Sequence, residues 1–217
     1  TENKATQIRY SVNSSFNSKV NSKLFIKAGV IDEVINLNLF YRVKEDNSQW
    51  NQKWDYNDYT SLIQGYAHAK YNFNDNVTLN VGVHSQFLTL NNSFSIEPRA
   101  GIKYQLNNKN TVSVGYGMHS QMQPTDVYFH RELQANGTYD LSNKNLDFTR
   151  SQHFVLGYDV LPAKDWRVKV ETYYQLLSNV PVTNYSSSFS MLNSGASFNP
   201  NEQGYLQNKG TGTNYGL

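Results

Sequence analysis

Histidines are the first side chains in this sequence to consider for metal or acid–base chemistry. There are five of them, His68, His84, His119, His130 and His153. Metal sites place their ligands at short, fixed spacings, as in the HExxH pattern. No two of these histidines have such a spacing, and no HExxH occurs. His68 and His84 fall on the polar side of alternating segments, where histidine is an ordinary residue. We therefore expect no metal site and no cofactor.

Glycines and carboxylates offer two further kinds of chemistry. The stretch GTGTNYG, residues 210–216, has the spacing G-x-G-x-x-x-G, without the helix or acidic ribose partner of a dinucleotide loop. Its three glycines are better interpreted as filling one face of a strand. Glu97 and Glu171 share their faces with basic residues, which favours a charge ladder over acid–base catalysis. No G-x-S-x-G nucleophile elbow occurs, so we expect no enzyme.

Aromatic and polar side chains gather in two segments, WNQKWDYNDY (50–59) and HSQMQPTDVYFHREL (119–133). Aromatic rings with a few polar groups are typical of ligand sites, and these rings could stack on a sugar or a planar chelate. The same side chains could instead pack the loops against each other. The candidate ligand-binding residues are Trp50, Trp54, Tyr56, His119, Gln121, Tyr128, His130 and Arg131.

The elements that must position these residues are strands. Apolar and polar residues alternate with a period of two, whereas helical periodicity is not sustained anywhere. The sequence therefore predicts an all-β, antiparallel fold. About nine strands are predicted, near residues 6–16, 23–31, 59–73, 77–90, 94–106, 111–119, 152–161, 166–177 and 207–217.

The connections between these strands differ in length. Every second one is a tight turn, at 17–22, 74–76, 107–110 and 162–165. Three of the four between them, 32–58, 120–150 and 178–206, run to about 27 to 31 residues; the link at 91–93 is short. Within 32–58, VINLNLFYRV either extends the second strand or forms a separate hairpin. Transmembrane β-barrels have this asymmetry, with short periplasmic turns and long extracellular loops.

The two faces of each strand also differ. Residues 94–106 place Phe94, Ile96 and Ile102 on one side and Glu97, Arg99 and Lys103 on the other. Such strands exceed the about 9–11 tilted residues that cross the hydrocarbon. Aromatic residues that suit an interfacial girdle lie beside the tight turns: Phe16, Tyr71, Phe73, Tyr104 and Trp166. We expect the apolar face to contact lipid; the alternative is a second sheet in a soluble sandwich.

Composition narrows the function classes. The 217 residues are 38% hydrophobic and 17% charged, with a net charge of +2. No basic footprint for nucleic acid is present. Cysteine is absent, so disulfides and thiolate metal sites are excluded. No apolar run is long enough for a transmembrane helix, and the start, TENKATQIRYS, is no signal peptide.

Residues 94–217 resemble a known family. The segments SIEPRAGIKYQLNNKNTVSVGYGMHSQMQPTDVYF, LDFTRSQHFVLGYDV, VKVETYYQLLSNVPV, SMLNSGASF and NKGTGTNYGL follow one another in order. They resemble the C-terminal half of the barrel in large TonB-dependent outer-membrane receptors of the Bacteroidetes type. The resemblance is close over about 120 residues and loose over the first 90.

The resemblance implies a multi-pass protein of the Gram-negative outer membrane, with a barrel of about 22 strands plugged by an N-terminal domain. Such receptors capture a scarce iron chelate, vitamin or oligosaccharide outside, and the TonB complex pulls the plug. This chain departs from the family because it has no plug, no TonB box and about nine strands. Two unpaired edges would not be tolerated in a membrane. We therefore expect residues 1–217 to be one partial β-barrel domain from a longer protein, in contact with outer-membrane lipid.

Two alternatives stay open. The first is a soluble, all-β ligand-binding module, lectin-like in its use of aromatic loops. The second is a passive porin or adhesin of the same barrel architecture. A plug sequence would separate a transporter from a porin, and a requirement for detergent would separate either from the soluble module.

Overall fold

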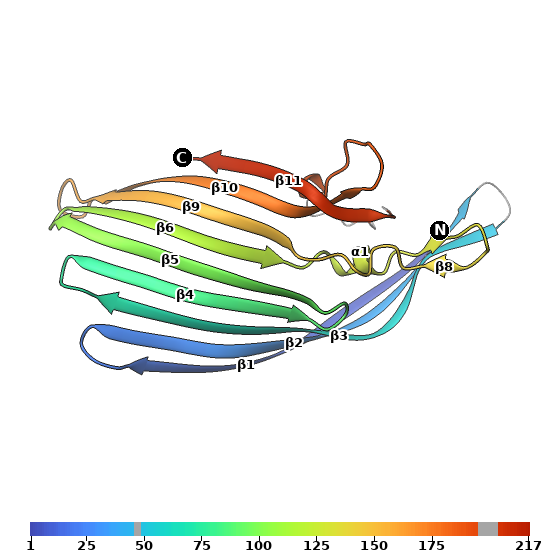
Figure 1. Cartoon of the computed structure of the whole chain (residues 1–217), viewed down its shortest axis with the longest axis horizontal. Helices are drawn as coiled ribbons and strands as arrows, with labels where there is room; N and C mark the ends of the chain where they lie inside the picture. The colour runs from blue at the N-terminus through green and yellow to red at the C-terminus, as the bar shows by residue number, and fades with distance from the viewer. Residues whose placement is uncertain (46–48, 195–203) are drawn as a thin grey trace.

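The computed structural model describes residues 1–45, 49–194 and 204–217. It contains one large antiparallel sheet of nine strands in the order β1-β2-β3-β4-β5-β6-β9-β10-β11 (Figure 1). The strands are β1 (Glu2–Lys19), β2 (Leu24–Glu45), β3 (Gln49–Asn72), β4 (Val77–Leu88), β5 (Ser93–Asn107), β6 (Asn110–Gln121), β9 (Thr149–Val160), β10 (Val168–Thr183) and β11 (Leu206–Gly216). The all-β, antiparallel prediction is confirmed.

Strands that are adjacent in the sheet are also consecutive along the chain, except that β6 pairs with β9. A longer segment joins these two strands. That segment holds the short helix α1 (Thr125–Tyr128) and a hairpin of β7 (Glu132–Leu133) and β8 (Tyr139–Asp140). A 3-10 turn, η1 (Met191–Asn193), follows β10. These one-turn helices lie inside predicted loops, where sequence periodicity is too short to reveal them. In the described residues β1 and β11 are the two edges, and the sheet does not close.

The tight turns all lie at one end of the sheet, the left end in Figure 1. Three of them are closed by an asparagine side chain that accepts hydrogen bonds from the backbone two and three residues later. Asn21 Oδ1 accepts from the Lys23 and Leu24 amides at 2.8 Å each. Asn74 and Asn107 repeat this arrangement. Such Asx turns explain why short asparagine-rich segments reverse the chain here.

The opposite end carries the long connections, but the segment 32–58 is not a loop. Residues 32–45 and 49–58 belong to β2 and β3, which pair from Leu24–Tyr71 to Glu45–Gln49 with one register shift between Tyr41 and Arg42. With β1, which pairs with β2 as far as Glu2–Arg42, they extend beyond β4, β5 and β6 as an arm (Figure 1). The predicted ends of these strands, 31 and 59, were therefore wrong. The alternation in VINLNLFYRV continues the period of two of β2, so the open alternative is settled in favour of an extended strand.

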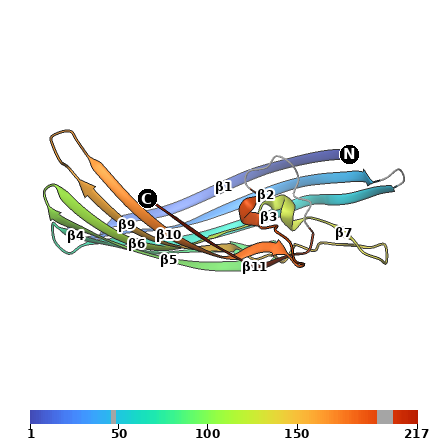
Figure 2. The same ribbon diagram turned by 90° about the horizontal axis from the view of Figure 1, so that it is seen from above.

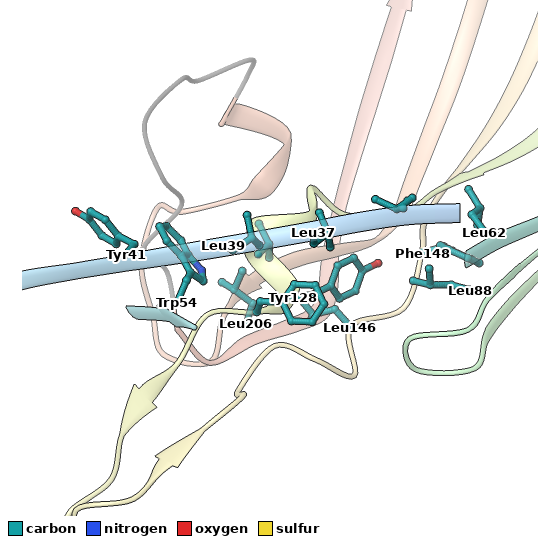
Figure 3. Packing of buried hydrophobic residues seen from close by; sticks show 13 residues of the cluster. Leu37, Leu39, Tyr41, Trp54, Leu62, Leu88, Tyr128, Leu146, Phe148 and Leu206 are labelled. Carbon is teal, nitrogen blue, oxygen red and sulfur yellow. The ribbon is translucent and has the colours of Figure 1, made fainter. Parts of the chain in front are cut away.

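The hydrophobic core of the described residues lies at the base of this arm, not under the middle of the sheet. Ile35, Leu37 and Leu39 of β2 pack against α1 and the segments around Leu146 and Leu206 (Figure 3). We call this group the cap cluster. It consists of Ile35, Leu37, Leu39, Tyr41, Trp54, Leu62, Leu88, Val127, Tyr128, Phe129, Leu146, Phe148 and Leu206.

The rest of the sheet is a single curved layer, as Figure 2 shows. A soluble sandwich needs a second sheet against its apolar face. Among the described residues the second sheet consists only of β7 and β8, two residues each. Within the described residues no second sheet therefore packs on the large sheet, and its strands form a one-layer wall.

Candidate functional site

One face of the wall, which we call the outer face, is apolar and uncovered. Val81 of β4 is 40% exposed, and its partner on β5 is Ala100. The same face continues through exposed Ile8, Tyr10 and Val12 on β1, Ile96 and Ile102 on β5, Leu156 on β9, and Val168 and Val170 on β10. Soluble monomers rarely expose an apolar surface that spans a whole sheet. This face therefore requires an apolar surrounding.

Aromatic residues at the tight-turn end lie on or beside this face. Phe16, Tyr71, Phe73, Tyr104 and Trp166 are all exposed, and the rings of Tyr71 and Phe73 meet edge to face with centroids 4.9 Å apart. Their predicted position at the strand ends is confirmed. An amphipathic ring at that level suits the boundary between acyl chains and water.

The opposite face, which we call the inner face, is mainly polar. Glu97 of β5 lies at the centre of its hydrogen-bond network. Its carboxylate accepts hydrogen bonds from Gln86 Nε2 at 2.5 Å and Ser95 Oγ at 3.0 Å. It also contacts His84 Nδ1 at 2.9 Å and Arg99 Nη2 at 3.1 Å. A buried carboxylate needs several such partners to offset the loss of hydration.

This network reaches across four strands. His84 Nε2 contacts Gln64 Oε1 on β3 at 3.1 Å, while Gln86 Nε2 also donates to the Ser120 carbonyl on β6 at 2.8 Å. Further along, Gln175 Nε2 of β10 lies 3.0 Å from His153 Nε2 of β9. The expected charge pairs on this face are present for Glu97 with Arg99 and for Glu171 with Lys169.

Three of the predicted ligand-binding residues belong to or contact the cap cluster. Trp54 is 3% exposed and its Nε1 donates to the Asp126 carbonyl at 2.8 Å. Tyr56 stacks on Phe129 with ring centroids 3.7 Å apart. Tyr128 is fully buried, and its hydroxyl accepts from the Gln123 amide at 3.0 Å. These contacts fasten the segment after β6 to the arm.

His130 and Arg131 continue the same attachment. His130 is buried, with Nε2 3.2 Å from Glu132 Oε2 and its ring edge-on to Trp54. The Arg131 amide donates to the Lys53 carbonyl at 2.8 Å, and its guanidinium pairs with Asp55 at 3.0 Å. The guanidinium also lies 4.4 Å from the centre of the Tyr139 ring.

The remaining candidates lie outside this cluster. Trp50, near the tip of the arm, is 42% exposed and has the Arg42 guanidinium 4.4 Å from a ring centre. His119 is on the inner face of β6, beside His153. Gln121 ends β6 at a hollow of about 520 Å³ that β1 and the segment 120–126 enclose. The eight residues are thus divided between the cap cluster with its surroundings, the arm and the inner face.

Burial changes the acidity of the cap tyrosines. Desolvation raises the pKa of Tyr128 to about 12, and the nearby Asp147 charge acts in the same direction. Burial, with the Asp58 charge, also raises the pKa of Tyr56. Both phenols therefore stay protonated and act as neutral packing groups over the physiological range.

Sequence reasoning missed several residues that build this region. Phe129 and Phe148 are buried in the cap cluster, and Gln123 Nε2 donates to both the Asp147 carbonyl and Thr149 Oγ1 at 3.0 Å. The alternation of Ile35, Leu37 and Leu39 was a readable signal that β2 carries an apolar stripe. Its packing partners in α1 and around Leu146 and Leu206 are about 90 to 170 residues away in the chain, and no local pattern identifies them.

Within the described residues, no group of three or more histidine, cysteine or acidic side chains could hold one metal ion. No helix in those residues is long and apolar enough to cross a membrane.

The sheet is similar to the barrel walls of solved receptors. The siderophore receptor PirA from Pseudomonas aeruginosa aligns with a TM-score of 0.69 at 13% identity, over 97% of this chain and 38% of that one. The RagAB peptide importer in its closed-closed state aligns with 0.61 at 11%, over 97% and 27%. The FrpB iron transporter from Neisseria meningitidis, an apoprotein, aligns with 0.58 at 11%, over 83% and 31%.

These likenesses show the fold, a wall of antiparallel strands like that of the β-barrel receptors. The chain spans between 27% and 38% of the length of these three proteins. No family model and no curated protein matches the sequence.

Proposed function

We propose that this chain forms part of the barrel wall of a TonB-dependent transporter in the outer membrane of a Gram-negative bacterium. The observation that carries this proposal is the pair of unlike faces on a one-layer sheet. The outer face exposes Ile96 and Val170 while the inner face buries the Glu97 network. Lipid covers an apolar face without a second protein layer, and a polar face suits a water-filled lumen.

The two ends of the wall support the same proposal. Tight turns closed by Asn21, Asn74 and Asn107 suit the periplasmic side. The arm and the cap cluster suit the outer side, where a ligand arrives. The fold is similar to that of a siderophore receptor and of a peptide importer. The ligand proposed is a scarce one, such as an iron chelate, a vitamin or an oligosaccharide.

We assign the eight candidate residues two different parts in ligand capture. Trp50, His119 and Gln121 are the proposed direct contacts, since Trp50 and Gln121 are exposed and His119 lines the inner face. Trp54, Tyr56, Tyr128, His130 and Arg131 position the cap that faces the ligand. Release to the periplasm would need a plug domain and the TonB complex, and both belong to the proposal.

The wall is also proposed to be a portion of a larger, closed barrel. β1 and β11 each present one edge that pairs with no strand in the described residues. An open edge within hydrocarbon leaves backbone groups without hydrogen bonds, at a cost of several kcal/mol each. Further strands of the same barrel would satisfy them.

Cell fractionation tests the proposal. Source cells are lysed, outer membranes are separated from inner membranes and soluble protein, and an antibody against this chain is used on each fraction. We expect a band in the outer membrane at several times the 24.9 kDa of this chain. A soluble band near that mass would contradict both the location and the larger barrel.

Uptake distinguishes a transporter from a porin. Deleting the gene for TonB should abolish uptake of the ligand while leaving the outer-membrane band unchanged. Uptake that continues at the same rate without TonB would indicate a passive pore.

A further inference from the structure

A row of inner-face residues crosses the middle of the wall where β5, β6 and β9 lie side by side. Arg99 of β5 is in register with Gly117 of β6, and Gly117 is in register with His153 of β9. The central position of the row has no side chain. Arg99 and His153 therefore flank an open floor on the inner face.

His119 extends over that floor from two residues further along β6. A Cβ added to Gly117 would lie 3.1 Å from His119 Nε2 and 3.7 Å from Arg99 Cγ. The rings of His119 and His153 meet edge to face, with centroids 5.1 Å apart. The result is a hollow of about 280 Å³ whose side chains include Arg99, His119, His153 and Val155.

The polar side chains around this hollow are hydrogen-bond donors rather than acids. No carboxylate of the described residues lines it. The nearest acid in the network, Glu97, is 1% exposed and is already bound by Gln86, Ser95 and His84. Arg99 uses Nη2 for Glu97 but keeps 45% of its side chain exposed.

A hydrogen bond also determines which nitrogen of the His153 ring carries the proton. Gln175 Nε2 is 3.0 Å from His153 Nε2. With the amide as donor, His153 Nε2 is the acceptor and Nδ1 carries the ring proton. A guanidinium and two imidazoles within one small hollow offer N–H groups to an oxygen anion, and such charge-assisted bonds are the strong ones.

We propose that Arg99, His119 and His153 form a subsite for an oxyanion, the carboxylate or phosphate group of a small ligand. Gly117 allows His119 to lie over the floor of this subsite, because a side chain there would meet His119 Nε2. Oxyanion binding at this subsite follows from the geometry alone. A role for the subsite in import, in which the transported ligand carries an acidic group, rests on the proposed function.

The test uses the full chain in detergent micelles with isotope-labelled histidine rings. Inorganic phosphate and, separately, acetate are titrated at constant ionic strength while the ring resonances of all five histidines are followed. We expect saturable shifts at His119 and His153, and none at His68, which lies on the same face beyond Gly82. Equal shifts at all three histidines would overturn the subsite.

Arg99→Gln should weaken phosphate binding by about tenfold or more, because it removes a charged donor. The matched control is Arg9→Gln, an inner-face arginine of β1 whose exposed pair is with Glu33; its affinity should be that of the wild type. Arg99→Lys keeps the charge and the ion pair, and should lose affinity several-fold because the planar fork is gone. Unchanged affinity in both Arg99 variants would overturn the assignment.

The two proposals fail separately. Specific shifts at His119 and His153 in a chain that fractionates as soluble protein would leave the subsite standing and remove transport. A chain in the outer membrane without those shifts would leave transport standing and remove the subsite.

Discussion

Glu97 Oε2 lies 2.9 Å from His84 Nδ1 on the neighbouring strand, at a point where the carboxylate is almost completely withdrawn from water. Gln86, which binds the other carboxylate oxygen, also donates to the Ser120 carbonyl. One acidic side chain thus connects β4, β5 and β6 on the inner face. In a wall without a packed core beneath it, such bonds add to the backbone ladders that join neighbouring strands.

Replacing this acid should weaken the wall. Glu97→Ala leaves His84, Gln86 and Ser95 without their common acceptor, and breaking a buried charged network costs about 3 kcal/mol. We expect a lower midpoint of denaturant unfolding in detergent, followed by circular dichroism.

The control for that variant is Glu171→Ala, also on the inner face. Glu171 pairs with Lys169 at 2.7 Å, but both side chains are about half exposed. An exposed pair contributes about 1 kcal/mol or less, so its midpoint should hardly move. Equal losses in the two variants would show that the Glu97 network is no more important than a surface pair.

The assignment of the two faces predicts opposite results for adjacent residues of β4. Val81→Arg places a charge on the outer face and should cost about 2–4 kcal/mol at the midplane of a bilayer. Asn80→Arg directs the same side chain to the inner face, opposite Gly101 and Lys70, and should be mild. The folded fraction after insertion into lipid vesicles measures both, and equally harmless substitutions would reverse the assignment.

Alkaline pH should loosen the cap. The pKa of Tyr128 is about 12 in the folded chain against 10.0 for an ordinary tyrosine. Below pH 10 the phenol is neutral in both states, so its contribution is fully present. Between pH 10 and about 12 the unfolded chain loses the proton first, and stability falls by up to about 2–3 kcal/mol as pH rises.

Phenolate absorbance measures this effect. The wild type minus Tyr128→Phe difference should titrate near pH 12. A difference that titrates near pH 10 would mean that Tyr128 is accessible to water and that the cap is not closed over it.

Two tryptophans of the arm should respond in opposite ways. Trp54→Ala removes a buried ring and its bond to the Asp126 carbonyl, at a cost of about 3–5 kcal/mol to the cap. Amide hydrogen exchange in residues 120–150 should accelerate accordingly. Trp50→Ala, at an exposed site, should leave exchange unchanged and reduce only ligand binding; faster exchange in that variant would contradict its proposed role as a direct contact.

Local patterns predicted the wall well. The alternation over 94–106 and the asparagine turns are properties of adjacent residues, and β5 with its turn at Asn107 follows them. The cap was not predictable in the same way, because Tyr128 and Phe129 meet Leu37 and Leu39 only through the fold. The extension of β2 could have been predicted, since its period of two continues without interruption, but the polar residues of the segment favoured a loop.

The nearest-neighbour order of the strands has a kinetic consequence. Hairpins close through links of two to seven residues at 20–23, 73–76, 89–92, 108–109 and 161–167, so little loop entropy opposes their formation. The pairings of β6 with β9 and of β10 with β11 must wait for longer segments of the chain, 122–148 and 184–205, to be traversed. Proteins dominated by local contacts fold fast, so the wall can grow strand by strand as the chain is delivered, with closure of the cap as its late step.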